Sequence, residues 1–245
     1  MAAGPVSAER AGRPRGRLGL PRAHFRRLGS TNEHARALAA AGAPHGTLVT
    51  AAEQSAGRGR QGRTWSAPPG RALLCSLVVR SLPRLLPLAA GVAVASEVGA
   101  TSVAAEHARL KWPNDVLIDG RKVAGILVEG RPQEGWAVIG IGVNVAVRPE
   151  ELPAELRERA GTLGLTPAAI EPTLARLLER LEEWLEAPDA AILDAVRARD
   201  ALLGRPVSWA GGSGVGAGID DDGRLLVATA SGRVALDAGE VHLGA

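Results

Sequence analysis

The chain has 245 residues, of which 46 % are hydrophobic and 22 % are charged, and its formal net charge at pH 7 is +3. A chain of this length can bury a sizeable core, and the composition is that of a globular protein. A single cysteine excludes internal disulfides, and the absence of an apolar run of about 18 residues argues against a membrane-spanning helix. We therefore expect a cytoplasmic protein with one main domain and a small addition.

The positive charge is concentrated near the N-terminus. Residues 1–29 hold seven Arg and one Glu, a net charge of +6, so residues 30–245 carry a net charge of −3. A leader rich in Pro, Gly and Arg is typical of disordered chain, and we expect residues 1–22 to form a disordered basic arm. A nucleic-acid-binding protein driven by this arm is one alternative. The negative charge of the remaining chain disfavours it.

Hydrophobic periodicity predicts helices and strands over residues 23–200. Ser30 followed by Glu33 matches a capping box, which predicts the start of a helix. Asp119-Gly120 between two apolar runs predicts a hairpin turn, which interrupts strict βαβ alternation and favours an α+β fold with a mixed sheet. The expected elements are a helix over 30–42, strands over 46–54 and 72–79, a helix over 85–105, strands over 108–112, 115–130 and 136–147, and an amphipathic helix from 173 to 185.

The composition changes after Gly204, where short apolar runs alternate with turn residues and no helical period is present. We expect residues 204–245 to form a small β-barrel that packs against the larger domain, because about 40 residues are marginal as an independent unit. The Gly-rich stretch 211–218 is interpreted as a turn of this barrel.

The loop GRGRQG (57–62) formally matches G-x-G-x-x-G. A dinucleotide-binding fold would need a helix directly afterwards and an acidic residue about twenty positions later. The segment that follows is rich in proline and position 82 is Leu, so that interpretation fails, and no P-loop pattern is present. Arginines 58, 60 and 63 between glycines suit the binding of a small anion, or of two anions that must be brought together. A solvated basic loop is the alternative.

Residue types that are rare in this chain mark further candidate positions. Against 27 Arg the chain has only two Lys, and a lysine retained in such a chain suggests that a compact ammonium group is needed. Asn is equally scarce, and its amide both donates and accepts hydrogen bonds. The rare residues that fall in motif-like segments are Lys111, Lys122, Asn32, Asn114, Asn144 and Gln54.

The inventory of candidate residues points away from a covalent nucleophile. The five histidines show no metal-ligand spacing, and no Ser-His-Asp or Cys-His set is evident. Cations, amides, glycines and one carboxylate, Asp115, instead fit electrostatic stabilisation of phosphate chemistry. A cation held near Asp115 and the phosphates is compatible with this inventory.

Taken together, several segments resemble those of biotin protein ligase, also called biotin–[acetyl-CoA-carboxylase] ligase. The pairing of GRGR…G with KWPND is the most specific part, and the resemblance covers roughly residues 23–245. It implies a catalytic domain like that of class II synthetases, with a mixed β-sheet and flanking helices, and an SH3-like C-terminal β-barrel. The matching segments are STN (30–32), EQSAGRGRQGRTW (53–65), KWPNDV (111–116), GRKVAGILVE (120–129) and IGIGVNV (139–145).

The resemblance implies an enzyme that makes biotinyl-5′-AMP from biotin and ATP with Mg²⁺. Such an enzyme then transfers biotin to one lysine of a biotin carboxyl carrier protein. Larger relatives carry an N-terminal helix-turn-helix that represses biotin genes, and residues 1–22 are too few for one, so we expect neither repressor activity nor DNA binding. We expect no membrane association, and a homodimer is left open. The alternative is a lipoate or octanoate ligase or transferase of related fold, which the paired motifs disfavour.

The resemblance also implies roles for individual residues. Lys122 and Arg60 are the expected catalytic cations, and Asp115 is the candidate orienter or base in the transfer step. No residue is assigned as a metal ligand. The expected biotin-binding residues are Ser30, Thr31, Asn32, Gln54, Gly57, Arg58, Gly59, Arg60, Lys122 and Gly125. The expected ATP- or adenylate-binding residues are Arg58, Arg60, Arg63, Trp65, Lys111, Asn114 and Asn144.

Overall fold

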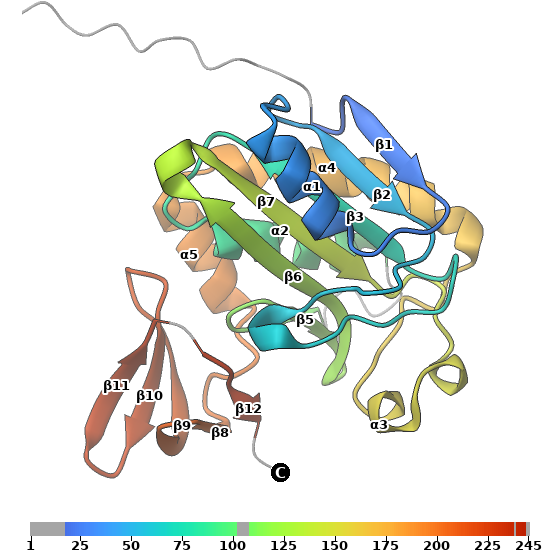
Figure 1. Ribbon diagram of the computed structural model, residues 1–245. Helices are drawn as coiled ribbons and strands as arrows, with labels where there is room; N and C mark the ends of the chain where they lie inside the picture. Colours follow the sequence, from blue (N-terminus) through green and yellow to red (C-terminus); the bar gives the residue numbers. More distant parts are fainter. Residues whose placement is uncertain (1–17, 102–107, 238, 244–245) are drawn as a thin grey trace, which may run out of the picture.

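A computed structural model describes residues 18–101, 108–237 and 239–243 of the chain (Figure 1). Its larger part is a seven-stranded sheet with helices on both faces, and a five-stranded sheet follows near the C-terminus. No helix in the described part of the chain combines the length and the apolar character needed to cross a bilayer.

The larger sheet has the strand order β1-β2-β3-β7-β6-β5-β4. Strands β1 and β2 pair in parallel, and every other neighbouring pair is antiparallel. The expected α+β class with a mixed sheet is therefore confirmed. The strands are β1 (Arg22–Phe25), β2 (Leu48–Ala51), β3 (Leu73–Val79), β4 (Arg109–Lys111), β5 (Asp115–Ile118), β6 (Arg121–Arg131) and β7 (Trp136–Val143).

Helix α1 covers one face of this sheet, and α2, α4 and α5 cover the other (Figure 1). Twelve of the sixteen residues of α2 are buried because the helix lies between the sheet and α4, whereas α4 buries only Thr173, Leu174, Leu177 and Leu181. The helices are α1 (Thr31–Ala40), α2 (Leu86–Thr101), the short α3 (Ala154–Arg157), α4 (Ile170–Glu186) and α5 (Asp189–Ala198). The 3-10 helices are η1 (Arg60–Gly62), η3 (Pro132–Glu134), η4 (Pro149–Glu151) and η5 (Pro167–Ala169).

Two local sequence signals are confirmed. The Ser30 hydroxyl accepts a hydrogen bond from the Glu33 backbone N–H at 3.4 Å, which caps α1. Asp119 and Gly120 both have positive φ, 50° and 76°, and form the turn between β5 and β6. Helix α5 was not anticipated, although Ile192, Leu193 and Val196 recur at helical spacing.

The C-terminal sheet has the order β11-β10-β9-β8-β12 and is held against the main domain. The Trp112 indole N–H donates to the Gly223 carbonyl at 3.0 Å, and the Arg197 Nε donates to the Ile219 carbonyl at 2.9 Å. The expected packing of a small β unit against the larger domain is thus observed. Its strands are β8 (Pro206–Trp209), β9 (Gly212–Ile219), β10 (Leu225–Thr229), β11 (Gly232–Leu236) and β12 (His242–Leu243).

The interpretation of residues 211–218 as a turn is wrong, because most of this stretch belongs to strand β9. Its glycines allow neighbouring backbone to come close rather than bending the chain. A Cβ on Gly214 would lie 2.3 Å from the Ala228 carbonyl oxygen, and one on Gly216 would lie 2.1 Å from that of Leu202.

The prediction that residues 1–22 form a disordered arm is also wrong at the C-terminal end of that range. The Leu18 side chain is buried in the main core, and its backbone N–H donates to Glu182 Oε1 at 2.8 Å. Gly19 donates to the Gly46 carbonyl at 2.9 Å, and β1 already begins at Arg22. Burial of the apolar Leu18 side chain orders this part of the chain despite the basic residues around it. Residues 1–17 of the expected arm lie outside the described residues.

Candidate active site

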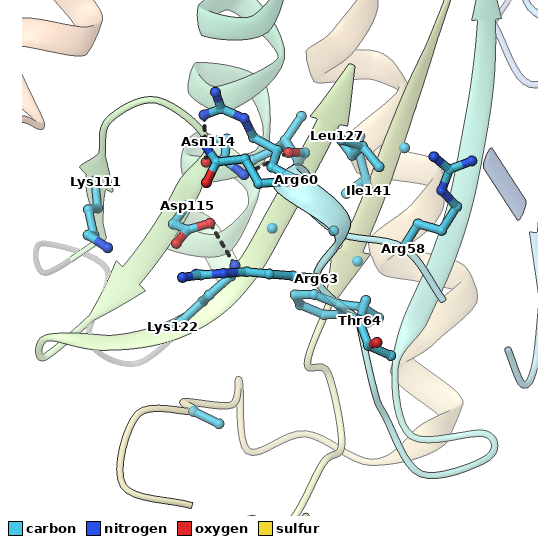
Figure 2. Close-up of a pocket in the computed structure, with 18 of the residues that line it drawn as sticks. Arg58, Arg60, Arg63, Thr64, Lys111, Asn114, Asp115, Lys122, Leu127 and Ile141 are labelled. Carbon is cyan, nitrogen blue, oxygen red and sulfur yellow. Dashed lines mark hydrogen bonds and ion pairs between the residues drawn. The ribbon is translucent and has the colours of Figure 1, made fainter. Parts of the chain in front are cut away.

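A cavity of about 540 Å³ opens on the face of the sheet that carries the start of α1 (Figure 2). The β5–β6 hairpin, the arginine loop (residues 57–65) and the start of α1 supply most of the residues that were singled out in the sequence. Residues 152–160 and the C-terminal segment 239–243 complete its wall. The cavity thus gathers parts of the chain that are far apart in sequence.

Glycines beneath the arginine loop let the Trp65 indole lie directly on the sheet. A Cβ on Gly142 would lie 2.5 Å from Trp65 Cε2, and a Cβ on Gly125 would lie 2.9 Å from Trp65 Cζ3. The Lys122 ammonium group is 5.5 Å from the Trp65 ring centroid, within cation–π range. The glycines therefore place an aromatic face and a cation side by side in the cavity.

A cluster of charged and amide groups occupies the hairpin side of the cavity (Figure 2). Lys122 Nζ lies 2.7 Å from Asp115 Oδ1, and Arg60 Nη1 donates to Asn114 Oδ1 at 3.3 Å. Burial lowers the pKa of Lys111 and of Arg60, and the nearby Asp115 carboxylate opposes this shift in both cases. The cluster thus holds cations at a cost in solvation, which an anionic ligand would relieve.

Summed over the whole lining of the cavity, positive charge exceeds negative charge. Its lining includes six basic side chains but only two carboxylates, Asp115 and Glu240. Such an excess attracts anions and raises their local concentration. The basic residues are Arg58, Arg60, Arg63, Lys111, Lys122 and Arg159.

A hydrogen-bond network of neutral side chains, backed by the Glu129 carboxylate, forms the opposite end of the cavity. The Thr31 backbone N–H donates to Gln54 Oε1 at 2.7 Å. The Ser76 hydroxyl lies 2.8 Å from both Thr31 Oγ1 and Asn32 Oδ1, and Asn32 Nδ2 donates to Glu129 Oε2 at 2.8 Å. These contacts fix polar groups that suit an uncharged ligand moiety with its own donors and acceptors.

The apolar wall formed by Leu152, Leu156 and Ala160 was not anticipated from the sequence. Backbone hydrogen bonds join the segment that carries this wall to Lys122. The Lys122 N–H donates to the Arg159 carbonyl at 2.7 Å, and the Lys122 carbonyl accepts from the Gly161 N–H at 2.8 Å. The wall therefore sits at a fixed place beside the cationic cluster. No signal for this wall was present in the sequence, because its residues are of common types and belong to no recognisable motif.

Two polar atoms remain available to a ligand in this region. Among the described residues, Trp65 Nε1 and Asn144 Oδ1 are buried without a hydrogen-bond partner. The other end of the Asn144 amide is engaged, since Nδ2 donates to the Gly161 carbonyl at 2.9 Å. A buried donor and a buried acceptor without partners are costly unless a ligand or water satisfies them.

The C-terminal unit contributes directly to the cavity, which the sequence did not predict. Arg63 of the arginine loop forms an ion pair with Glu240. His242 Nε2 lies 3.4 Å from Glu240 Oε1, and both residues line the cavity. The small sheet therefore shares the site with the main domain.

Fifteen of the sixteen predicted site residues line this cavity. The exception is Gly57, the first residue of the loop. Its carbonyl accepts from the Trp65 N–H at 3.0 Å, and a Cβ there would lie 2.3 Å from the Trp65 carbonyl oxygen. The structure therefore gathers the predicted set, while the individual roles stay predictions. The residues that line the cavity are Ser30, Thr31, Asn32, Gln54, Arg58, Gly59, Arg60, Arg63, Trp65, Lys111, Asn114, Asp115, Lys122, Gly125 and Asn144.

Comparison with known proteins identifies the family. Residues 24–145 match the biotin/lipoate A/B protein ligase family, and residues 202–244 match the biotin protein ligase C-terminal domain. The biotin–[acetyl-CoA-carboxylase] ligase of Mycobacterium tuberculosis is 37 % identical over 88 % of this chain and 86 % of its own length. The chain belongs to the biotin protein ligase family.

Two other biotin protein ligases match along nearly their whole length. The biotin–[acetyl-CoA-carboxylase] ligase of Paracoccus denitrificans is 36 % identical over 89 % of this chain and 98 % of its own length. A structure of the biotin protein ligase of Aquifex aeolicus in complex with biotin and ATP superimposes with a TM-score of 0.78, at 28 % identity, over 91 % of this chain and 98 % of that chain. The two-part architecture described above is therefore shared with this biotin protein ligase.

Proposed function

We propose that this protein is an ATP-dependent ligase that makes biotinyl-5′-AMP from biotin and ATP and then biotinylates a specific lysine of a carrier protein. The observation that carries the proposal is a single cavity with two chemically different ends. Neutral hydrogen-bonding groups at Thr31, Asn32 and Gln54 suit the uncharged ring system of biotin. Lys122 and Arg60 at the other end suit a carboxylate next to a phosphate.

In the first half-reaction, a biotin carboxylate oxygen attacks the α-phosphorus of ATP. A carbon–oxygen–phosphorus linkage forms, the bond to the β-phosphate oxygen breaks, and pyrophosphate leaves. The two reacting groups are both anions, so Lys122 and Arg60 lower the barrier by neutralising their repulsion and the charge of the transition state. Positioning in one cavity supplies much of the remaining rate acceleration.

In the second half-reaction, the carrier lysine attacks the biotinyl carbonyl and AMP leaves. The attacking amine must lose a proton for the amide bond to form. Asp115 is our candidate to orient the amine or to accept its proton. Its carboxylate lines the cavity, and its Oδ1 lies 2.7 Å from Nζ of the proposed catalytic Lys122. The arginine loop would shield the mixed anhydride from water between the two steps.

The adenine and ribose would lie against the apolar wall of Leu152, Leu156 and Ala160, beside Trp65. Trp65 Nε1 and Asn144 Oδ1 supply a free donor and a free acceptor on that side. Arg63, Lys111 and Asn114 would then surround the phosphates, in keeping with the positive charge of the cavity. This placement supports the expected adenylate-binding roles of these residues.

Mg²⁺ would enter with ATP as part of the nucleotide substrate. Within the described residues, no group of three or more His, Cys, Asp or Glu side chains is placed to hold a metal ion. The cavity offers the carboxylates Asp115 and Glu240, and Mg²⁺ is commonly held by one or two carboxylates together with substrate phosphates. The ion would help neutralise the departing pyrophosphate.

The proposed protein substrate is the biotin carboxyl carrier domain of a biotin-dependent carboxylase. It is supported by membership in a family whose relatives are named biotin–[acetyl-CoA-carboxylase] ligases. The absence of DNA binding and a cytoplasmic location stay predictions, and a homodimer is still left open.

The proposal is tested by incubating the protein with biotin, lipoate, ATP, Mg²⁺ and a carrier domain, followed by mass spectrometry. We expect biotinyl-5′-AMP and a biotinylated carrier lysine. Lipoyl-AMP without biotinyl-AMP would instead assign the protein to the lipoate ligases. Omission of ATP should abolish both products, because the adenylate is the activated donor.

Gly140→Ala is expected to raise the KM for biotin. A Cβ at this position would lie 2.0 Å from Asn32 Oδ1, so the buried amide must move. Overpacking costs about 1–3 kcal/mol, which corresponds to roughly a 5- to 150-fold change in affinity. Steady-state pyrophosphate release at varied biotin concentration measures the effect.

Gly130→Ala is the matched control for Gly140→Ala. Its Cβ would also crowd the sheet, at 2.8 Å from the Ala137 Cβ, but outside the cavity. It should lower the melting temperature without changing the biotin KM. Equal KM values for Gly140→Ala and the wild type would contradict the placement of biotin beside Asn32.

A further inference from the structure

Glu129 on β6 joins three side chains that come from two other parts of the chain. Its carboxylate accepts from Asn32 Nδ2 at 2.8 Å and forms ion pairs with Arg58 at 3.2 Å and Arg36 at 3.3 Å. The Glu129 side chain is only 20 % exposed and does not itself line the cavity. It therefore lies directly behind two residues that do, Asn32 and Arg58.

The contact with Glu129 is the shorter of two contacts that set which way the Asn32 amide points. Asn32 Oδ1 contacts the Ser76 hydroxyl, which can either donate or accept, so Ser76 alone would tolerate both orientations of the amide. An ionised carboxylate only accepts. Glu129, together with the Leu127 carbonyl, thus favours the orientation in which Nδ2 faces the carboxylate and Oδ1 faces Ser76. The Leu127 carbonyl also accepts from Nδ2, at the longer distance of 3.3 Å.

The same carboxylate holds the first arginine of the arginine loop. Figure 2 shows Arg58 turned away from the cluster of Arg60, Asn114, Asp115 and Lys122. The ion pair with Glu129 gives the Arg58 guanidinium a fixed partner on the sheet. One side chain therefore connects the loop to the network that carries Asn32.

We propose that Glu129 is a positioning residue that fixes the Asn32 amide and anchors the arginine loop through Arg58. It acts through these two residues and does not touch the substrate. Loss of the carboxylate should therefore weaken biotin binding and loosen the loop, while the chemistry at Lys122 continues once biotin is bound. The part of this inference that concerns biotin rests on the proposed function, whereas the part that concerns the loop does not.

Two variants separate the contributions of shape and charge. Glu129→Gln keeps the size and an acceptor oxygen but removes the charge that pairs with Arg58, and Glu129→Ala removes both. Glu129→Ala leaves the Asn32 donor without its best acceptor, so the biotin KM should rise on the order of tenfold while kcat changes less than about twofold. Glu129→Gln should show a smaller rise in KM.

Loop anchoring is measured without any ligand, by limited trypsin digestion with mass spectrometry of cleavage after residues 58, 60 and 63. Both Glu129 variants should be cut in the loop several-fold faster than the wild type. This readout stays informative even if the protein made no biotinyl-5′-AMP, so failure of the proposed function and failure of this inference are distinguishable. Circular dichroism melting verifies that each variant is folded.

Arg36→Ala is the matched control, because it removes the other ion pair of Glu129 from a residue on α1 that does not line the cavity. It should leave both the biotin KM and loop cleavage at wild-type values. The proposal is overturned if folded Glu129→Ala has a wild-type KM and cleavage rate. It is equally overturned if Arg36→Ala reproduces both effects, because packing of α1 would then account for them.

Discussion

Lys122→Ala is expected to slow pyrophosphate release by on the order of 10²–10³-fold, the loss typical of removing one group that stabilises transition-state charge. Backbone hydrogen bonds to the Arg159 carbonyl and from the Gly161 N–H hold Lys122 in place, so its ammonium group projects from a fixed point of β6. It lies between the Asp115 carboxylate and the face of Trp65. A cation held there meets both reacting anions, and alanine leaves their repulsion uncompensated.

The ion pair with Asp115 creates a second route by which Lys122→Ala could lose activity. The variant frees the Asp115 carboxylate, which is then an additional anion in the cavity. The double variant Lys122→Ala with Asp115→Asn removes that carboxylate as well. We expect the double variant to stay as slow in pyrophosphate release as the single one, and recovery of adenylation would show that the freed carboxylate was the cause.

Two further variants define what the site requires of Lys122. Lys122→Arg keeps the charge but is expected to remain impaired, because the side chain is confined between Trp65 and Gly125, where an added Cβ would lie 3.1 Å from Lys122 Cε. Arg121→Ala, at an exposed neighbour, should retain wild-type adenylation. Near-normal pyrophosphate release by Lys122→Ala would contradict its assignment.

The features that were predictable from the sequence depend on local chemistry or on rare residue types. The Ser30 cap and the Asp119-Gly120 turn involve residues at most three positions apart, so their signals lie within a short window. Lys122 and Asn114 were found because this chain uses Lys and Asn so rarely. Both signals can be read without knowledge of how distant segments meet.

The features that were missed depend on long-range contacts between common residue types. Ser76 and Glu129 contact Asn32 across 44 and 97 positions of sequence, and neither belongs to a rare residue type. Glu240 enters the cavity only because the C-terminal sheet packs against the main domain. Strand β9 was mistaken for a turn because its glycines serve close backbone contacts that the sequence does not reveal.

Arg60→Gly is expected to release the adenylate intermediate before transfer, so that lysines of unrelated proteins become labelled. The Arg60 guanidinium is half-buried, donates to Asn114 Oδ1 at 3.3 Å, and lies close enough to Asp115 and Glu240 for both to oppose the lowering of its pKa by burial. Loss of one partner from a buried charge pair costs about 2–5 kcal/mol, so dissociation of biotinyl-5′-AMP should accelerate on the order of 100-fold.

Retention is measured by rapid gel filtration of the enzyme with radiolabelled intermediate, and escape is measured by biotin labelling of a bystander protein. Glycine also adds backbone freedom to the loop, which is a separate cause of leakage. Gln61→Gly is the control for that effect, because Gln61 is the adjacent exposed residue, and its φ of 54° already lies where glycine is favoured. We expect Gln61→Gly to hold the intermediate nearly as well as the wild type. Equal leakage from both variants would mean that rigidity of the loop retains the adenylate, and that the charge of Arg60 does not.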